Sequence, residues 1–128
     1  MSVQEKRVRL QNYIRQNPAM ANVPFLVVGS RHVSPKEALG QLGNPDVMAA
    51  LQSAGIDPPE DDWALTAEYY RRLAAKARPP PVIAQLQGGY ITKMTPAQAL
   101  AEIEARTAIG EQLVKAQSKL INRIRQGI

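Results

Sequence analysis

Two stretches with a shared pattern decide how this chain folds: SPKEALGQL at residues 34–42 and TPAQALAEI at residues 95–103. In each, serine or threonine can accept a hydrogen bond from the free N–H groups of a first helical turn. Proline follows at the first helical position, where it loses no hydrogen bond. The glutamate or glutamine three residues after the cap can bond back to it. Both stretches therefore predict the start of a helix.

The surroundings of the two stretches are also alike. Each is preceded by an apolar run, a glycine and an apolar residue next to the cap, Val33 or Met94, and each is followed by a second helix start, at Asn44 or Thr107. Two interpretations remain open. The pattern is common enough to occur twice by chance, or the chain contains a duplication with residues 24–78 and 82–128 as half-modules.

Composition predicts the fold class. The chain has 128 residues, enough for the single domain that we expect over residues 1–128, and only 5% of them are aromatic. An aliphatic core of this kind favours helices packed on helices. We therefore predict a mainly α protein, a compact or extended bundle of five to six short helices that begin at proline. Two short apolar segments, residues 23–28 and 82–86, are expected to be extended, either as strands or as core-filling segments.

Hydrophobic spacing places the helices and their buried faces. Helices are expected over residues 2–16, 34–54 as a pair, 60–78, and 95–126 with a break at 107–110. The expected buried residues are Val3, Leu10 and Ile14 in the first helix, Trp63, Ala67, Tyr70, Ala74 and Ala77 in the third segment, and Ile109, Leu113, Ala116, Leu120 and Ile124 in the last helix.

Charge is unevenly distributed along the chain. The net charge of +5 divides into +3 over residues 1–16, −4 over 17–62, +4 over 63–93 and +2 over the remainder. Basic residues late in a helix are explained by its dipole, but those early in the first helix oppose it. An anionic partner, or the acidic block of a second copy, would match this pattern. The candidate nucleic-acid-binding residues are Lys6, Arg7, Arg9, Arg15, Arg71, Arg72, Lys76, Arg78, Lys115, Lys119, Arg123 and Arg125.

Residues that could perform chemistry are sparse. The chain has no cysteine and a single histidine, His32, with no acidic residue near it in sequence. The acids Glu60, Asp61 and Asp62 stand where a helix start favours negative charge, so they do not require a metal. No glycine-rich phosphate loop occurs. The sequence therefore predicts a protein that is not an enzyme, with no catalytic residues, metal or cofactor.

The function that we expect is that of a structural protein that self-assembles and contacts the phosphate backbone of nucleic acid without reading its sequence. The alternative is a helical adaptor or regulatory module with residues 44–62 as an acidic docking patch. No secretory signal and no apolar run long enough to span a membrane are visible. A location in the cytoplasm or in a virion is expected.

The chain as a whole resembles the small basic, all-helical coat proteins of filamentous viruses of hyperthermophilic archaea. The resemblance lies in the basic early helix around residues 6–9, the short helices with proline at their starts, the prolines at 79–81 and the absence of cysteine. It implies a thermophilic capsid protein that forms oligomers, in which two related subunits enclose DNA with basic helices.

Overall fold

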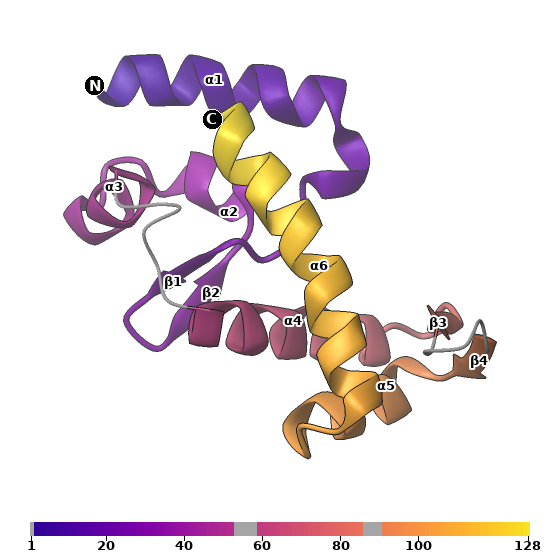
Figure 1. Cartoon of the computed structure of the whole chain (residues 1–128). Coiled ribbons are helices and arrows are strands. Elements are labelled where there is room, and N and C mark those ends of the chain that lie inside the picture. Colours follow the sequence, from indigo (N-terminus) through magenta and orange to yellow (C-terminus); the bar gives the residue numbers. More distant parts are fainter. Residues whose placement is uncertain (1, 53–58, 86–90) are drawn as a thin grey trace.

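The structure, a computed structural model, describes residues 2–52, 59–85 and 91–128 and is mainly helical (Figure 1). In the described residues the helices are α1 (Val3–Gln16), α2 (Pro35–Gly40), α3 (Pro45–Gln52), α4 (Pro59–Ala74), α5 (Pro96–Glu104) and α6 (Ala108–Gly127), with a 3-10 turn at Pro18–Met20. The strands are β1 (Leu26–Val28), β2 (Arg31–Val33), β3 (Val82–Gln85) and β4 (Ile91–Met94). The predicted fold class is confirmed.

Both predicted helix starts form with the same geometry. The Oγ of Ser34 accepts from the Glu37 amide at 3.3 Å, and the Ser34 amide donates to the Glu37 carboxylate at 3.2 Å. Thr95 and Gln98 make the same two bonds at 3.2 and 2.9 Å. Each capped helix follows directly on a hairpin and precedes another helix, so this order occurs twice. Its origin in a duplication remains a prediction.

The two apolar segments that the sequence left undecided contain strands. Leu26 pairs with Val33 in the first antiparallel hairpin, and Val82 pairs with Met94 in the second. Gly29 turns the first hairpin with a φ of +62°, a left-handed conformation that glycine adopts without steric cost. The partner strands were not predicted, because they are short and carry polar residues.

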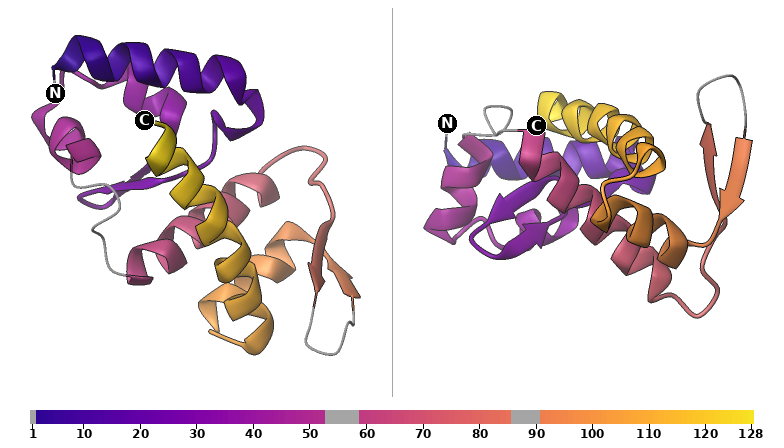
Figure 2. Two further views of the ribbon diagram at one scale, coloured as in Figure 1. Left: turned by 45° about the horizontal axis from the view of Figure 1, so that its top comes forward. Right: turned by 60° about the horizontal axis from the view of Figure 1, so that its bottom comes forward.

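Two hydrophobic clusters form the core, and α4 and α6 contribute to both. The first cluster gathers around the first hairpin and includes Leu10, Phe25, Leu26, Val33, Leu42, Val47, Leu65, Ile121 and Ile124. The second lies beneath the second hairpin and includes Val82, Ala84, Ala99, Ile103, Leu113 and Val114, with Trp63, Ala67 and Tyr70 packed against it. Figures 1 and 2 show α6 running from α1 at one end to α5 at the other.

This position of α6 corrects its predicted buried face. Ala116 is exposed and Leu120 only half-buried, although the sequence pattern placed both in the core. Gln117 and Ile121 are buried instead. The reason is that α6 crosses from one cluster to the other, so its buried stripe is centred on Gln117, a residue that an apolar pattern cannot identify.

Two further expectations were wrong. Val3 is 40% exposed, and the residue of α1 that is buried together with Leu10 is Lys6. The third segment leaves the helix at Ala74 rather than at 78, so the predicted seam residue Ala77 is exposed. A residue before proline avoids the helical region, so Pro79 sets a limit only at Arg78, and α4 ends four residues before that limit.

The corner between α5 and α6 is tight. The amide of Thr107 donates to the carbonyl of Glu102 and the amide of Arg106 to that of Ile103, which closes α5 in a Schellman motif. Arg106 has the left-handed φ of 54° that this motif needs, and its guanidinium lies 4.6 Å from the centre of the Trp63 ring. The cation–π contact offsets part of the backbone strain.

A substitution at Gly110 tests how closely α5 and α6 approach each other at this corner. A Cβ at Gly110 would stand 2.4 Å from the main-chain oxygen of Glu102, so Gly110→Ala must push α5 away from α6. We expect a loss of about 1–3 kcal/mol in the free energy of unfolding, measured with urea. Gly40→Ala is the control, because nothing lies within 4 Å of its Cβ. It should leave stability unchanged or raise it slightly, and an equal loss in both variants would contradict the close approach.

Candidate nucleic-acid interface

The structure separates the twelve predicted basic residues into three groups: buried, paired and exposed. Lys6 and Arg125 form the buried group. Lys6 is 8% exposed, and its ammonium donates to the main-chain oxygen of Ile128 at 3.2 Å. Burial lowers the pKa of Lys6, and the nearby charge of Arg9 lowers it further. The side chain of Lys6 therefore ties α1 to the end of α6 and is not available to a ligand.

Arg125 is enclosed between α4, α6 and the first hairpin. One nitrogen of its guanidinium lies 3.5 Å from a carboxylate oxygen of Asp62, and the two side chains are only 7% and 16% exposed. A second nitrogen donates to the main-chain oxygen of Phe25 at 3.5 Å. The Oγ of Ser118 donates to the same carboxylate at 2.7 Å. Asp62 therefore serves the packing of α4 on α6.

Three more basic residues are held by acids on the surface. Arg71 lies 2.8 Å from a carboxylate oxygen of Glu68, and Lys115 lies 3.4 Å from one of Glu111. Arg72 donates to Glu37 at 2.6 Å, to Glu68 at 3.3 Å and to the main-chain oxygen of His32 at 2.7 Å. The side chain of His32 is half-buried in β2. Its main-chain oxygen, which accepts from Arg72, helps to fix the first hairpin to α4.

The remaining seven are exposed: Arg7, Arg9, Arg15, Lys76, Arg78, Lys119 and Arg123. In residues 2–52, 59–85 and 91–128, none of these seven has an ion pair. Their charge is consequently available to an outside anion. They do not form one surface, because Lys76 and Arg78 follow the last turn of α4 while the other five lie on α1 and α6.

Arg123 comes close to Tyr13, where the end of α6 lies against α1, and Arg9 and Lys119 are neighbours of these two residues along their own helices. The ring of Tyr13 packs on Gly127, whose Cβ, if present, would be 2.6 Å from the ring. Arg123 is close enough to lower the pKa of the Tyr13 phenol, although burial outweighs it and the net shift is upward. Arg9 precedes Tyr13 by one turn, and Lys119 precedes Arg123 by one turn. We call Arg9, Tyr13, Lys119 and Arg123 the crossing surface.

Arg7 and Arg15 lie outside the crossing surface. They are two residues before and six residues after Arg9, which places them on other sides of α1. Lys76 instead borders a separate hollow of about 400 Å³ between α4 and the segment that follows α1, with Tyr69 and Asn22 among its other lining residues. The structure therefore places Arg123 near Tyr13, one turn from Arg9 on α1, and leaves Arg7, Arg15, Lys76 and Arg78 apart.

Tyr13 is the residue of this surface that the list of basic residues missed. The one-turn spacing of Arg9 and Tyr13 was visible in the sequence, but the sequence could not show that Gly127 and Arg123 would approach Tyr13.

In the described part of the chain, no group of three histidine or acidic side chains is arranged to hold a metal ion, and no helix is long and apolar enough to span a membrane. The chain has no significant match to a known protein family, to a curated protein or to a solved structure.

Because Arg72 is bound to the carboxylate of Glu37, the stability of the fold is expected to depend on pH. Burial disfavours the charged carboxylate, but the hydrogen bonds from Arg72 and Ser34 together outweigh it and lower the pKa of Glu37 below its ordinary value of 4.5. A lowered folded-state pKa stabilises the fold above the unfolded-state value, and that stability is lost as pH falls through the folded-state pKa.

Urea unfolding of the wild type and of Glu37→Gln at pH 7 and pH 3 checks this. The carboxylate is 42% exposed, so solvent screening keeps its contribution to about 0.5 kcal/mol or less. We expect the wild type to lose this amount more than Glu37→Gln does between the two pH values. Glu111→Gln, which removes an exposed carboxylate of α6, is the control. An identical pH dependence in wild type and Glu37→Gln would show that Arg72 is not held by Glu37.

Proposed function

We propose that this chain is a non-enzymatic structural protein that binds the phosphate backbone of nucleic acid through the crossing surface. The observation that supports this is the approach of Arg123 to Tyr13, with Arg9 and Lys119 one turn away along their own helices and no ion pair to any of the three in the described residues. Guanidinium and ammonium groups that are exposed and unpaired are the donors that phosphate oxygens accept. A net charge of +5 adds long-range attraction for a polyanion.

Contact with the backbone rather than with bases suits this geometry. Lys119 and Arg123 lie one turn apart on α6, and Arg9 lies on α1. The end of α6 lies against α1 (Figure 2). A recognition helix would instead present several side chains into a groove from an unobstructed face. Phosphate contacts require only a basic surface of matching spacing, so binding is expected to be independent of base sequence.

Self-association is the second part of this proposal, as the resemblance to helical coat proteins implies. Ile83 and Ile91 are 66% and 71% exposed, and the strand register places both on the outer face of the second hairpin. Exposed apolar patches commonly mark contact sites. Burying an isoleucine contributes about 1.5–3 kcal/mol, against an association cost of at least about 4 kcal/mol. The two isoleucines of each copy therefore favour contact between copies, and a bound polyanion would strengthen it by concentrating them.

The salt dependence of DNA binding tests the crossing surface. Fluorescence anisotropy of a labelled duplex should show binding at about 50 mM salt that weakens steeply by about 200 mM. Arg123→Gln should lower the slope of log K against log salt by about 0.9, the value of one phosphate contact, and the triple change of Arg9, Lys119 and Arg123 to glutamine should lower it by about 2–3. Arg71→Gln is the matched control, because Glu68 already holds that arginine.

Two results would contradict the assignment. Absence of binding by the wild type at the lowest salt would rule out nucleic acid as the partner. Equal losses of slope in Arg71→Gln and Arg123→Gln would show that binding follows total charge and not the crossing surface.

Light scattering over a range of protein concentrations tests self-association. We expect the mean mass of the wild type to rise with concentration, and Ile83→Thr with Ile91→Thr should abolish the rise. Threonine preserves the β-branched shape that strands favour, so the hairpin should remain folded. The same two changes should leave the salt slope of DNA binding unaltered. A mean mass that does not change with concentration in the wild type would remove this part of the proposal.

A further inference from the structure

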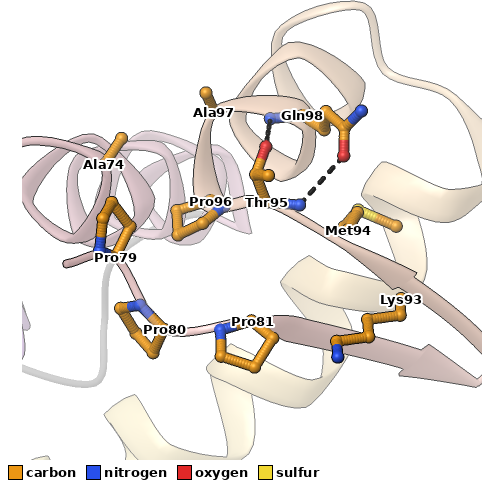
Figure 3. Close-up of a pocket in the computed structure, with 10 residues that line it drawn as sticks. All are labelled: Ala74, Pro79, Pro80, Pro81, Lys93, Met94, Thr95, Pro96, Ala97 and Gln98. Carbon is orange, nitrogen blue, oxygen red and sulfur yellow. Dashed lines mark hydrogen bonds between the residues drawn. The ribbon is translucent and has the colours of Figure 1, made fainter.

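A cavity of about 470 Å³ opens at the base of the second hairpin, at the other end of α6 from the crossing surface (Figures 1 and 3). Val82 and Met94 form the end pair of the hairpin. The segment before Val82 and the segment after Met94 separate there, and we call the space between them the fork. Pro79–Pro81 line one side of the fork, and Thr95–Gln98 line the other, with Ala74 of α4, Lys93 and Met94 completing the lining. This cavity plays no part in the proposed nucleic-acid contact.

The lining offers few hydrogen-bond donors, although the prolines keep their carbonyl oxygens and Gln98 keeps its side-chain nitrogen. The three prolines have no N–H to donate. Thr95 and Gln98 bond to each other through the capping box, which uses the Thr95 amide and hydroxyl and the Gln98 amide and side-chain oxygen. The other side chains of the lining, apart from Lys93, are apolar. A ligand with many polar groups would therefore leave them unpaired in this cavity, at a cost in affinity.

Lys93 supplies the charge. Its side chain extends from β4 toward Pro81, so the ammonium lies at the rim of the cavity (Figure 3). It is exposed, no carboxylate is present in the lining, and no ion pair to it occurs in the described part of the chain. The nine-residue α5 begins three residues later and directs its positive end to the same place. The cavity thus combines apolar walls with a single cationic group.

We propose that this cavity binds an apolar anion, specifically the carboxylate of a medium-length acyl chain, with the chain between the prolines and the carboxylate on Lys93. The volume falls within the range of small-molecule sites, whose walls are mainly apolar with a few polar groups that fix orientation. The rigid prolines lose little conformational freedom on binding. An acidic peptide fits less well, because its main chain needs donors and acceptors, and the prolines offer no donor.

Binding of decanoate, followed by NMR of protein labelled with ¹³C at the methionine methyl groups, tests the proposal. Met94 lines the cavity, whereas Met20 and Met48 pack against the first hydrophobic cluster and act as internal references. Met94→Leu assigns its signal. We expect saturable movement of the Met94 methyl signal with decanoate at concentrations below those at which it forms micelles, while the signals of Met20 and Met48 stay in place.

The charge requirement is tested by a pair of variants and a pair of ligands. Lys93→Gln should weaken decanoate binding by about twofold to fivefold, the effect of losing one exposed ion pair, and Lys119→Gln should not change it. Decanol, which has no charge, should bind wild type and Lys93→Gln equally. The changes at the crossing surface that reduce DNA binding should leave decanoate binding intact, so either proposal can fail without the other.

Three results would overturn the inference. The Met94 signal could fail to move, all methionine signals could move together as in unspecific partition, or Lys93→Gln could bind decanoate as well as the wild type. If a synthetic acidic amphipathic peptide moved the Met94 signal and decanoate did not, the cavity would be a site for a protein segment and not for an acyl carboxylate.

Discussion

The buried contact between Asp62 of α4 and Arg125 of α6 determines how the remaining elements can be arranged. Arg125 also reaches the main-chain oxygen of Phe25, and Ser118 donates to Asp62, so two helices and the first hairpin meet at one group of polar atoms. A charged side chain in such a place costs about 3–5 kcal/mol when its counter-charge is removed. Helix α6 is therefore held in the position on α4 that keeps the two side chains together.

The exposed surface follows from that position of α6. With Gln117 and Ile121 directed to the interior, Lys119 and Arg123 are left on the solvent side. The end of α6 then reaches α1, where Lys6 bonds to the oxygen of Ile128 and Tyr13 packs on Gly127. Charges from the two ends of the sequence thus become neighbours. At the other end of α6, Gly110 allows α5 to approach closely, and α5 forms one wall of the fork under the second hairpin.

Local signals were sufficient to predict where helices start. The capping boxes, the prolines at helix starts and the 3–4 spacing of apolar residues depend on bonds within a few residues, so the sequence around 34–42 and 95–103 predicts them without knowledge of the fold. The same logic located the break between α5 and α6 at Thr107, which caps α6 through the Gly110 amide. It could not reveal that Lys6 and Arg125 would be buried, because Lys6 bonds to Ile128, and Arg125 contacts Asp62 and Phe25, all far away along the chain.

The class of fold, the helix starts and the sign of the charge could be predicted from the amino-acid order, since each depends on composition or on neighbours along the chain. Which charges stay available depends on how the helices pack. Of twelve basic residues, Lys6 and Arg125 contribute to the interior, and Arg71, Arg72 and Lys115 are held by acids. Only the packing of α6 on α1 brought Arg123 and Gly127 to Tyr13, because residues more than a hundred positions apart meet through packing and not through local pattern.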